Sequence, residues 1–576
     1  MGDKVRVAAV QFGAGNDVDA NLTKALAMID QAAEQTPDLM VLPEFVNHLS
    51  WYKDKSHCFK VSVALDSGFL EAIAVKAKEH NCYIIINCTV QREDDTATGS
   101  SMIYNPQGEL VSVSDKQVLM GHENDYLKRA SAESPIIETP IGKIASYACM
   151  DGVINETPRI LALRGAQILC NSLNSFAFDE ASLHIPVRAA ENKVFVVAAN
   201  KVDPLIPEES IAFVSQATGV PAQFLDGAGE SQIVAPDGTV LAKGPLKGDA
   251  VVVADIDPLW ADDKSRPDGT DIFANRRPEL YGAIGAEPPV KRVWEKGAPT
   301  LQTAVYQPKS DGKKAIEECV IAVAQAVSFG VQLLVLPELF CFDDGMIDTD
   351  VDTAVSRSRQ AINALTAALQ TSNSDAVVVT SLVENNDNDV QHVGVMISKD
   401  GVIHRQAQLH ISERHSTWVS DLGDGIQTMQ MPWGKLAIVV GDDAIYPETF
   451  RLAVFAGADV VALPFHVLEQ WELDLGLVER SAENRVCLVA ASRPTEFGAS
   501  LLTTLHKDFT IFTEWKERPF DGTISHPLVT RAANEPGLTQ FTVHPEATVN
   551  KIVSRNTDLV DGRPWYLAEA ITRVIE

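Results

Sequence analysis

Three side chains in the first half of this 576-residue chain have the chemical types needed for acyl transfer at a carbonyl carbon. Cys149 ends the apolar run KIASYAC, Glu44 closes the run VLPE, and Lys116 follows VSVSD. A thiolate is a nucleophile, a carboxylate can carry its proton, and an ammonium group can stabilise an oxyanion. Together they could attack a carbonyl group and release an amine.

None of these residues is informative alone. A cysteine that ends an apolar strand is more often a buried structural thiol, and a lone lysine is more often a solvated surface charge. Each of the three, however, follows an apolar run that is typical of a strand. Side chains at the C-terminal ends of such strands line crevices in α/β folds. The elements around the three residues therefore favour a shared site.

The residues after Cys149 predict a turn that leads into a helix. Thr157 suits an N-cap, Pro158 suits the first helical position, and Gly165 suits the stop. Helix N-termini and nearby cations lower the pKa of a cysteine thiol, so we expect a reactive position.

An internal duplication organises the whole chain. LMVLPEF at 39–45 returns as LLVLPEL at 333–339. Residues 142–166 align without a gap with residues 434–458, at an offset of 292. The same offset carries Arg188 onto Arg480. Several blocks in one order with nearly one spacing indicate two copies of one domain.

Each copy alternates apolar strand patterns with amphipathic helix patterns, which predicts an α/β fold with buried sheets. Between the copies, residues 283–300 hold prolines, glycines and mixed charge without an amphipathic period, as expected of a linker. The predicted domains are residues 1–282 and 301–576.

Composition excludes several classes of partner. The formal net charge is −30 and there is no Lys/Arg cluster, so we expect neither nucleic-acid nor membrane binding. Eight cysteines occur without a CxxC pair or a zinc-ligand spacing, which argues against a metal site and a disulfide scaffold. With no long apolar run, the expected compartment is the cytoplasm, where thiols stay reduced.

The motifs of residues 5–282 resemble the nitrilase superfamily of carbon–nitrogen hydrolases. The resemblance rests on VLPEF, on the lysine after a strand and on the cysteine in CMDG. It extends to the later blocks RAAENKVFVVAAN, GESQIVAPDGTVLA and NRRPELYG. Their order and spacing make it specific. It implies two tandem αββα four-layer sandwiches.

The resemblance also implies a Glu–Lys–Cys triad in the first copy. Glu44 corresponds to the general base and acid, Lys116 to the oxyanion stabiliser, and Cys149 to the acylated nucleophile. The backbone N–H of Met150 corresponds to a second oxyanion donor. Glu123 corresponds to a further catalytic glutamate that is common after the lysine. The implied reaction runs through a thioester and requires no metal or organic cofactor.

The resemblance favours a small linear amide as the substrate. True nitrilases in the superfamily usually carry Trp-Glu after the cysteine, whereas amidases and carbamoylases often carry an aspartate two residues on, as Asp151 does here. By family position, the acyl pocket is expected near His48, Trp51, Tyr52, Phe176 and Phe178.

The second copy keeps the scaffold but not the chemistry. Only the glutamate survives, as Glu338, while Lys116 maps to Gln408 and Cys149 maps to Gly441. We therefore expect residues 301–576 to be a degenerate, pseudoenzyme domain with a structural or regulatory role. Single-domain relatives pair across a two-fold axis, so an intramolecular pseudo-dimer is expected, with further homo-oligomers left open.

Alternatives remain open at this point. Within enzymes they are nitrile hydrolysis and N-carbamoyl amide hydrolysis. A papain-type protease is disfavoured, because it would leave Glu44 and Lys116 unexplained. In another class, the chain could be a non-catalytic scaffold or binding protein, which the intact triad argues against.

Overall fold

A computed structural model describes residues 4–290, 292–343, 345–386 and 389–574. Their contacts form two compact units. Unit 1 comprises residues 1–264, 508–526 and 552–576, and unit 2 comprises residues 265–507 and 527–551. These units divide the chain differently from the expected repeat boundaries 1–282, 283–300 and 301–576. Two stretches of the second repeat belong to unit 1, and residues 265–300 belong to unit 2.

Unit 1 is built on two sheets that lie face to face. The first has the strand order β13-β1-β2-β3-β4-β5, with β6 on β4, and the second has the order β12-β11-β10-β9-β8-β7. The strands of the first sheet are β1 (Val5–Gln11), β2 (Leu39–Val41), β3 (Tyr83–Gln91), β4 (Ala97–Tyr104), β5 (Leu110–Asp115), β6 (Leu127–Lys128) and β13 (Ala250–Ile256). Those of the second are β7 (Ile137–Thr139), β8 (Gly142–Ala148), β9 (Ile168–Ser172), β10 (Phe195–Ala199), β11 (Gln232–Val234) and β12 (Val240–Lys243).

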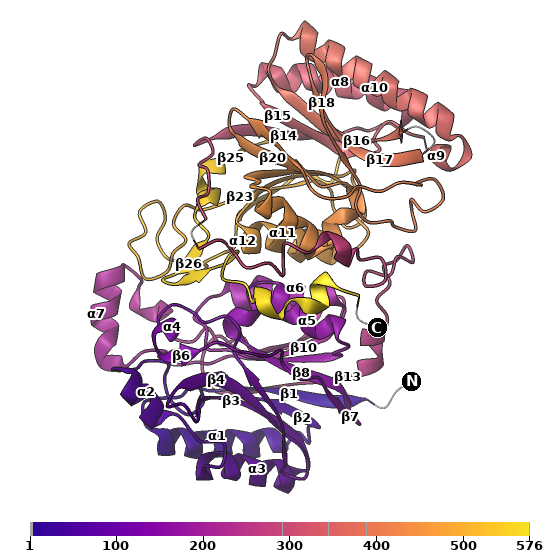
Figure 1. Cartoon of the computed structure of the whole chain (residues 1–576). Coiled ribbons are helices and arrows are strands. Elements are labelled where there is room, and N and C mark those ends of the chain that lie inside the picture. Colours follow the sequence, from indigo (N-terminus) through magenta and orange to yellow (C-terminus); the bar gives the residue numbers. More distant parts are fainter. Residues whose placement is uncertain (1–3, 291, 344, 387–388, 575–576) are drawn as a thin grey trace. The chain divides into compact units, whose positions relative to one another are not determined.

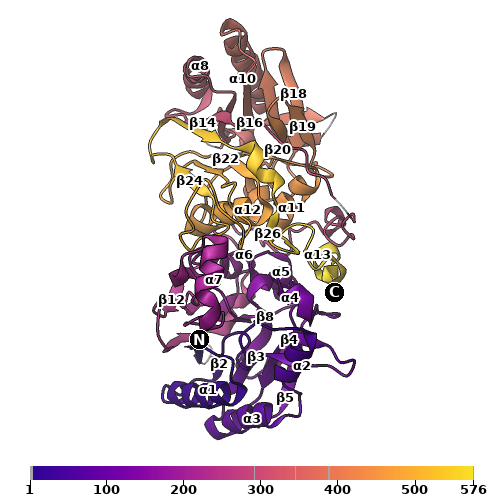
Figure 2. The same ribbon diagram turned by 90° about the vertical axis from the view of Figure 1, so that its left-hand side faces the viewer.

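Helices cover the outer face of each sheet of unit 1 (Figure 1). On the first sheet lie α1 (Val18–Ala33) and α3 (Gly68–His80), and on the second lie α5 (Glu156–Leu163) and α6 (Ile185–Asn192). The other helices of the unit are α2 (Lys55–Val61), α4 (Glu123–Tyr126), α7 (Glu208–Thr218) and α13 (Glu569–Thr572). Helix α13 comes from the end of the chain, yet it lies beside α5 in both views (Figures 1 and 2).

Apolar periodicity explains this layering. Strand β1, which lies between β13 and β2, is buried along nearly its whole length, as expected of a strand covered on both faces. Helix α1 begins where the Asp17 side chain accepts hydrogen bonds from the N–H groups of Asp19 and Ala20, and it buries Ala25, Met28 and Ile29 against the sheet.

Unit 2 repeats the plan. Its first sheet has the order β18-β17-β16-β15-β14-β25 and its second β19-β20-β21-β22-β23-β24. The strands are β14 (Leu301–Gln307), β15 (Leu333–Glu338), β16 (Val377–Asn386), β17 (Asp389–Ser398), β18 (Gly401–Ala407), β19 (Thr428–Met431), β20 (Gly434–Ile438), β21 (Val460–Pro464), β22 (Cys487–Ala491), β23 (Leu501–Thr504), β24 (Leu528–Arg531) and β25 (Gly537–Val543). The helices are α8 (Gly312–Ser328), α9 (Met346–Thr349), α10 (Val351–Thr371), α11 (Pro447–Phe455) and α12 (Leu477–Asn484).

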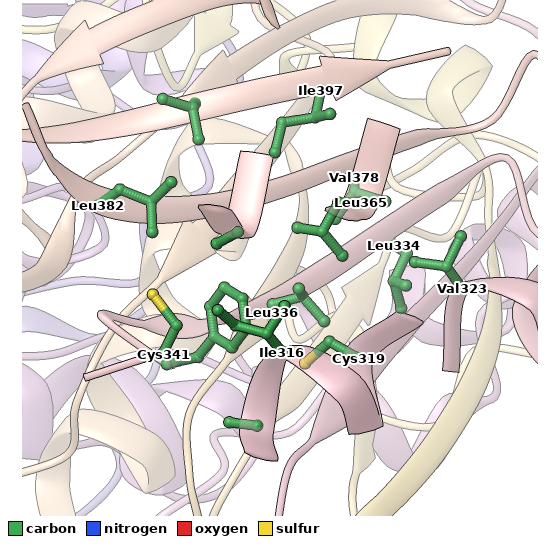
Figure 3. Packing of buried hydrophobic residues seen from close by; sticks show 14 of the residues in the cluster. Ile316, Cys319, Val323, Leu334, Leu336, Cys341, Leu365, Val378, Leu382 and Ile397 are labelled. Carbon is green, nitrogen blue, oxygen red and sulfur yellow. The ribbon is translucent and has the colours of Figure 1, made fainter. Parts of the chain in front are cut away.

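The core between α8, α10 and the first sheet of unit 2 shows how these layers are held (Figure 3). Ile316, Cys319 and Val323 project from α8 and meet Leu334 and Leu336 of β15. Burying one such aliphatic side chain contributes roughly 1.5–3 kcal/mol, so this layer is firmly attached. The α/β sandwich predicted from the sequence is confirmed, once in each unit.

Among the described residues, no helix combines the length and the apolar character needed to cross a membrane. All eight cysteines are buried free thiols.

Candidate active site

Cys149 lies at a strained turn between strand and helix. Strand β8 ends at Ala148, and the 3-10 turn Cys149–Gly152 follows. The φ angle of Cys149 is 48°, in the left-handed region that costs a non-glycine residue about 1–3 kcal/mol. The side chain of Asn171, on β9, accepts a hydrogen bond from the Cys149 N–H at 3.1 Å and helps to hold this turn. This strained turn places the Cys149 thiol just beyond the C-terminal end of strand β8.

The helix after this turn starts slightly earlier than expected. Helix α5 begins at Glu156, and its N-cap is Asn155 rather than Thr157. The Thr157 hydroxyl donates instead to Gln117 Oε1 at 2.9 Å, so it ties the helix to the segment after Lys116. Gly165, with a φ of 96°, follows the helix as predicted.

Three ionisable side chains meet in the interior beside this turn. Lys116 Nζ lies 2.8 Å from Glu44 Oε1, and 2.8 and 3.0 Å from the two carboxylate oxygens of Glu123. All three are almost completely buried. Within the described residues neither Glu44 oxygen has a well-aligned hydrogen-bond donor, so its contact with Lys116 is an ion pair rather than a directed hydrogen bond. The Glu44 carboxylate thus keeps lone pairs with which to accept a proton.

Burial and charge tune Glu44 toward neutral pH. Burial raises the pKa of Glu44, Lys116 opposes the rise, and the result is a pKa of about 7. Burial alone would lower the pKa of Lys116, but Glu123 and Glu44 outweigh it and hold that pKa well above its ordinary value. Lys116 is therefore a permanent cation, while Glu44 can both accept and donate a proton near pH 7.

The Cys149 thiol behaves differently from the sequence expectation. Burial, followed by the negative charge of Glu44, raises the pKa of Cys149 well above that of a free cysteine, although Lys116 opposes the change. We expected a lowered pKa, but desolvation outweighs the nearby cation at this depth. At neutral pH we therefore expect Cys149 to be a thiol rather than a thiolate.

Asp151 fastens the cysteine turn to the lysine segment. Its Oδ1 accepts hydrogen bonds from the N–H groups of Gln117 at 3.0 Å and Val118 at 2.7 Å. In unit 2 the equivalent Asp443 accepts from the N–H groups of Leu409 and His410, both at 2.8 Å. This aspartate therefore has a structural function that does not depend on the catalytic residues.

A cavity of about 110 Å³ opens beside Cys149. Met150, the residue proposed to donate a second oxyanion hydrogen bond, and Glu123 both line it. Of the residues expected near the acyl pocket, Phe176 lines the cavity, and so does Ser50, next to Trp51. His48 and Tyr52 instead stack on each other, with ring centroids 5.9 Å apart. Phe178 packs against Phe224.

Lys201 is a buried cation that the sequence reasoning missed. Its ammonium donates to the carbonyl of Phe45 at 3.0 Å. Phe45 directly follows Glu44 and has a strained φ of 51°. Burial lowers the pKa of Lys201 to about 8, against the opposing effect of Glu44. Comparing the repeats would have given a hint, because Arg493 stands at the same position and donates to the carbonyl of Phe340 at 2.6 Å.

The corresponding site in unit 2 has become a network of fixed charges. Gly441 keeps the positive φ of the nucleophile position, at 53°, and an added Cβ there would lie 2.8 Å from Glu338. His415 stands where Glu123 would be, 3.1 Å from Glu338. Arg414 lies 3.2 Å from Glu338 and 2.8 Å from Asp442. Burial would raise the pKa of Glu338, but Arg414 and His415 hold it well below its usual range.

Among the described residues of this network, the side chains that could bind a metal ion already contact one another or neighbouring side chains. Glu338, His392 and His415 do place potential ligand atoms within 4.8 Å of one another. The two ring nitrogens of His392, however, contact Ser381 Oγ at 2.7 Å and Gln408 Oε1 at 2.9 Å. The neighbouring cavity is only about 10 Å³, which admits at most one water molecule.

The chain thus contains two α/β sandwiches, and one of them holds a buried glutamate–lysine–glutamate cluster beside a cysteine with a strained backbone. The family model for carbon-nitrogen hydrolase matches residues 6–264 and matches again at residues 301–508. The chain belongs to this family, as a nitrilase-superfamily member with tandem domains.

Each of the following known proteins matches about half of this chain. A protein from Pyrococcus abyssi called "Nitrilase" is 26% identical over 278 residues, covering 48% of this chain and 99% of the relative. The human "Deaminated glutathione amidase" is 26% identical, covering 48% and 84%. Among solved structures, an amidase from Nesterenkonia sp. AN1 in complex with acrylamide is 19% identical, with a TM-score of 0.40, covering 49% of this chain and 97% of that one.

Proposed function

We propose that unit 1 hydrolyses a small linear amide through a cysteine thioester, with Glu44, Lys116, Glu123 and Cys149 as the catalytic residues. The observation that supports this most is the cluster around Lys116, in which two buried carboxylates lie within 3.0 Å of one ammonium group. Two of its members, Glu44 and Lys116, also act on the pKa of the Cys149 thiol. A buried cluster of this kind is costly to keep for stability alone.

The proposed mechanism follows from the charges. Glu44 takes the Cys149 proton as the sulfur attacks the amide carbonyl, and Lys116 with the Met150 N–H stabilises the oxyanion. The C–N bond breaks and the nitrogen leaves with the proton from Glu44. Water then gives a proton to Glu44 and its oxygen attacks the thioester. The C–S bond breaks, and the released sulfur takes that proton from Glu44, which restores the thiol and the carboxylate. Glu123 orients Lys116 throughout.

We propose that the second copy, residues 301–576, is degenerate and that the part of it within unit 2 has a structural role, while residues 508–526 and 552–576 belong to unit 1. Glycine at position 441 has no nucleophile, and Arg414 neutralises the surviving Glu338. The intramolecular pseudo-dimer stays a prediction. Because Asp151 has the same structural function as Asp443, it does not by itself favour an amide over a nitrile. That preference rests on the resemblance.

Mass spectrometry of the intact protein tests the proposal. The protein would be mixed with linear aliphatic amides, the matching nitriles and N-carbamoyl compounds, while released ammonia is measured. An amidase gives ammonia and an acyl mass increment on the peptide that holds Cys149. Carbon dioxide released with ammonia would instead indicate a carbamoyl substrate. Turnover without any adduct, in every quenched sample, would contradict thioester chemistry.

The rate should depend on pH through Glu44. Since this carboxylate must be ionised to take the thiol proton, kcat/KM is expected to rise with pH and to level off above an apparent pKa near 7. The midpoint belongs to the whole coupled cluster. A rate profile measured from pH 5 to 9 checks this. In Glu44→Gln the activity should be lost at every pH, and a profile without a limb near 7 would exclude Glu44 as the base.

Lys201→Met should shift the acidic limb of the pH–rate profile to higher pH. The Lys201 charge lowers the pKa of Glu44, so its removal is expected to raise the midpoint by up to about one unit. Lys201→Arg, which copies Arg493 of the second repeat, is the matched control and should stay near the wild-type midpoint. If the methionine variant loses rate equally at all pH values, Lys201 supports the fold and does not tune the base.

A further inference from the structure

A long loop of the second repeat belongs to the compact unit that holds the active site. In the first copy, β11 and β12 are joined by the short turn 235–239. In the second copy, the equivalent strands β23 and β24 are joined by residues 505–527. Loops longer than about 12–15 residues are uncommon and are usually functional. We use the name C-terminal strap for residues 508–526 together with the hairpin β26 (Ile552–Ser554) and β27 (Thr557–Asp558).

The first anchor of the strap is Asp179, in the loop after β9. Its Oδ2 accepts hydrogen bonds from the N–H groups of Ile524 at 3.0 Å and Ser525 at 2.6 Å, and from the Ser525 hydroxyl at 2.8 Å. Next to it, the Phe178 N–H donates to the Gly522 carbonyl at 2.8 Å. Gly522 has a φ of 93°, and a Cβ there would lie 2.5 Å from the Phe178 ring. This fit leaves the loop little freedom.

The second anchor is Thr557, which holds the segment that carries Glu123. Its buried hydroxyl accepts from the Gly121 N–H at 2.8 Å and donates to the Leu119 carbonyl at 3.0 Å. The same segment presents the Met120 N–H to Glu123 Oε2 at 2.8 Å. The strap therefore meets the chain two residues away from a member of the catalytic cluster.

Between its anchors the strap forms one wall of the cavity beside Cys149. The lining residues that it contributes are Ile511, Phe512, Ile524, Ser525, Val553 and Ser554. Its backbone is fixed there by a hydrogen bond of 2.8 Å from the Ile511 N–H to the Val553 carbonyl. On the first-copy side, Phe176, Ile206 and Leu225 complete an apolar enclosure.

The charges around the cavity limit what can enter. Glu123, Asp179 and Glu180 line it together with His122 and His184, and among the described lining residues there is no lysine or arginine. Nε2 of His122 already contacts the Ser50 carbonyl, and Nε2 of His184 contacts the Ser525 hydroxyl. Lys116 is already paired with two carboxylates. A substrate carboxylate would thus lose its hydration beside three carboxyl groups without gaining a lysine or arginine partner.

We propose that the C-terminal strap is the specificity-determining wall of the active site, and that it selects amides with a short, uncharged, apolar acyl group. The proposal rests on the amidase function given above. A cavity near 150 Å³ lined by apolar residues can hold benzene, so about 110 Å³ should accommodate an acyl chain of roughly four or five carbons.

Selectivity along a homologous series of substrates tests the proposal. The full-length protein would be assayed for kcat/KM on acetamide, propionamide, butyramide, hexanamide and octanamide, with succinamate as a carboxylate-bearing compound close in length to butyramide. We expect the wild type to favour butyramide over octanamide and over succinamate, each by at least about tenfold, since one misplaced methylene is worth roughly 10–200-fold.

Truncation of the wall should move this preference. Ile524→Ala and Val553→Ala are expected to raise the octanamide-to-butyramide ratio of kcat/KM by about tenfold or more. Ile571→Ala removes the same side-chain volume as Ile524→Ala from a buried position of α13 outside the cavity, and it should leave the ratio unchanged. Equal ratios in the wild type and in both wall variants would overturn the proposal, as would a preference for succinamate.

A second measurement separates this proposal from the amidase function. Alkyl methanethiosulfonates from methyl to octyl transfer their alkylthio group to a thiol without any hydrolysis. Their rates of labelling at Cys149, followed by peptide mapping, should fall beyond pentyl in the wild type and recover in Ile524→Ala. If no amide is hydrolysed but this dependence holds, the strap proposal stands and the amidase proposal fails. If the labelling rate does not depend on alkyl chain length in any variant, the strap proposal is contradicted and the amidase proposal is unaffected.

Discussion

Cys149→Ala is expected to abolish turnover, lowering kcat by roughly 10⁴-fold or more, as removal of a nucleophile does in other covalent enzymes. The loss should come without a matching loss of stability, because alanine occupies the same backbone position and only the sulfur is removed. Ammonia release gives the rate, and a denaturant titration gives the free energy of unfolding. If the alanine variant kept more than a few per cent of the activity, Cys149 could not be the nucleophile.

Two further variants make this test specific. Cys170→Ala removes another buried thiol, on β9, and should keep its activity when assayed well below its melting temperature. Cys149→Gly should be as inactive as the alanine variant, yet more stable than it by about 1 kcal/mol, because glycine accepts a φ of 48° without strain. It would reproduce the state of Gly441, where the nucleophile is gone and the turn costs little.

Lys116→Met is expected to remove both activity and much of the stability. The variant leaves Glu44 and Glu123 buried without the ammonium group that pairs with both of them, and breaking a buried ion pair from one side costs about 3–5 kcal/mol. Loss of the oxyanion partner should lower kcat by roughly 10²–10³-fold or more. Unfolding titrations and ammonia release measure the two effects separately.

The stability loss in Lys116→Met should depend on pH in a defined direction. In the wild type the folded pKa of Glu44 is already raised to about 7, so this group stabilises the fold below its unfolded pKa, and that contribution is lost as the pH rises through 7. Without Lys116 the folded pKa rises further. The variant should therefore be less destabilised at pH 5 than at pH 8. A pH-independent loss would show that Lys116 contributes packing rather than charge.

A second substitution distinguishes charge from shape at this site. Glu123→Gln in the Lys116→Met background removes one of the two uncompensated carboxylates. We expect it to recover part of the stability and none of the activity. A double variant that is less stable than Lys116→Met would contradict the view that repulsion between the carboxylates dominates.

Much of this architecture could be predicted from the sequence because it depends on local sequence patterns. Apolar runs and helical spacing predicted an α/β fold with buried sheets, and the family resemblance implied the four-layer sandwiches. Blocks that recur at offsets of 292 and 294 residues indicated the duplication. Glu44, Lys116 and Cys149 each end or follow a strand-like run, and the structure brings Glu44 and Lys116 to within 2.8 Å of each other. The roles of these residues stay predictions, as do those of Glu123 and Met150.

What could not be predicted depends on depth and on distant contacts. The direction of the Cys149 pKa shift is set by burial, which the sequence does not state. Lys201 contacts a backbone carbonyl, so among sequence features only its alignment with Arg493 of the second repeat points to it. Ile524 and Val553 are ordinary apolar residues hundreds of positions from Cys149. The unequal loops between β11 and β12 and between β23 and β24 point to Ile524 but not to Val553.

The positions of the cavity-lining residues along the chain also affect the order in which the site is assembled during synthesis. Domains generally fold as units during synthesis, N-terminal first. The strands of both sheets of unit 1 lie within residues 1–264, whereas Val553 and Ser554, which line the cavity, are synthesised almost 300 residues later. Under the strap proposal a nascent chain that lacks them would hold the catalytic cluster beside an open, unselective cavity. Substrate selectivity would therefore appear only after the strap has been synthesised and has packed onto unit 1.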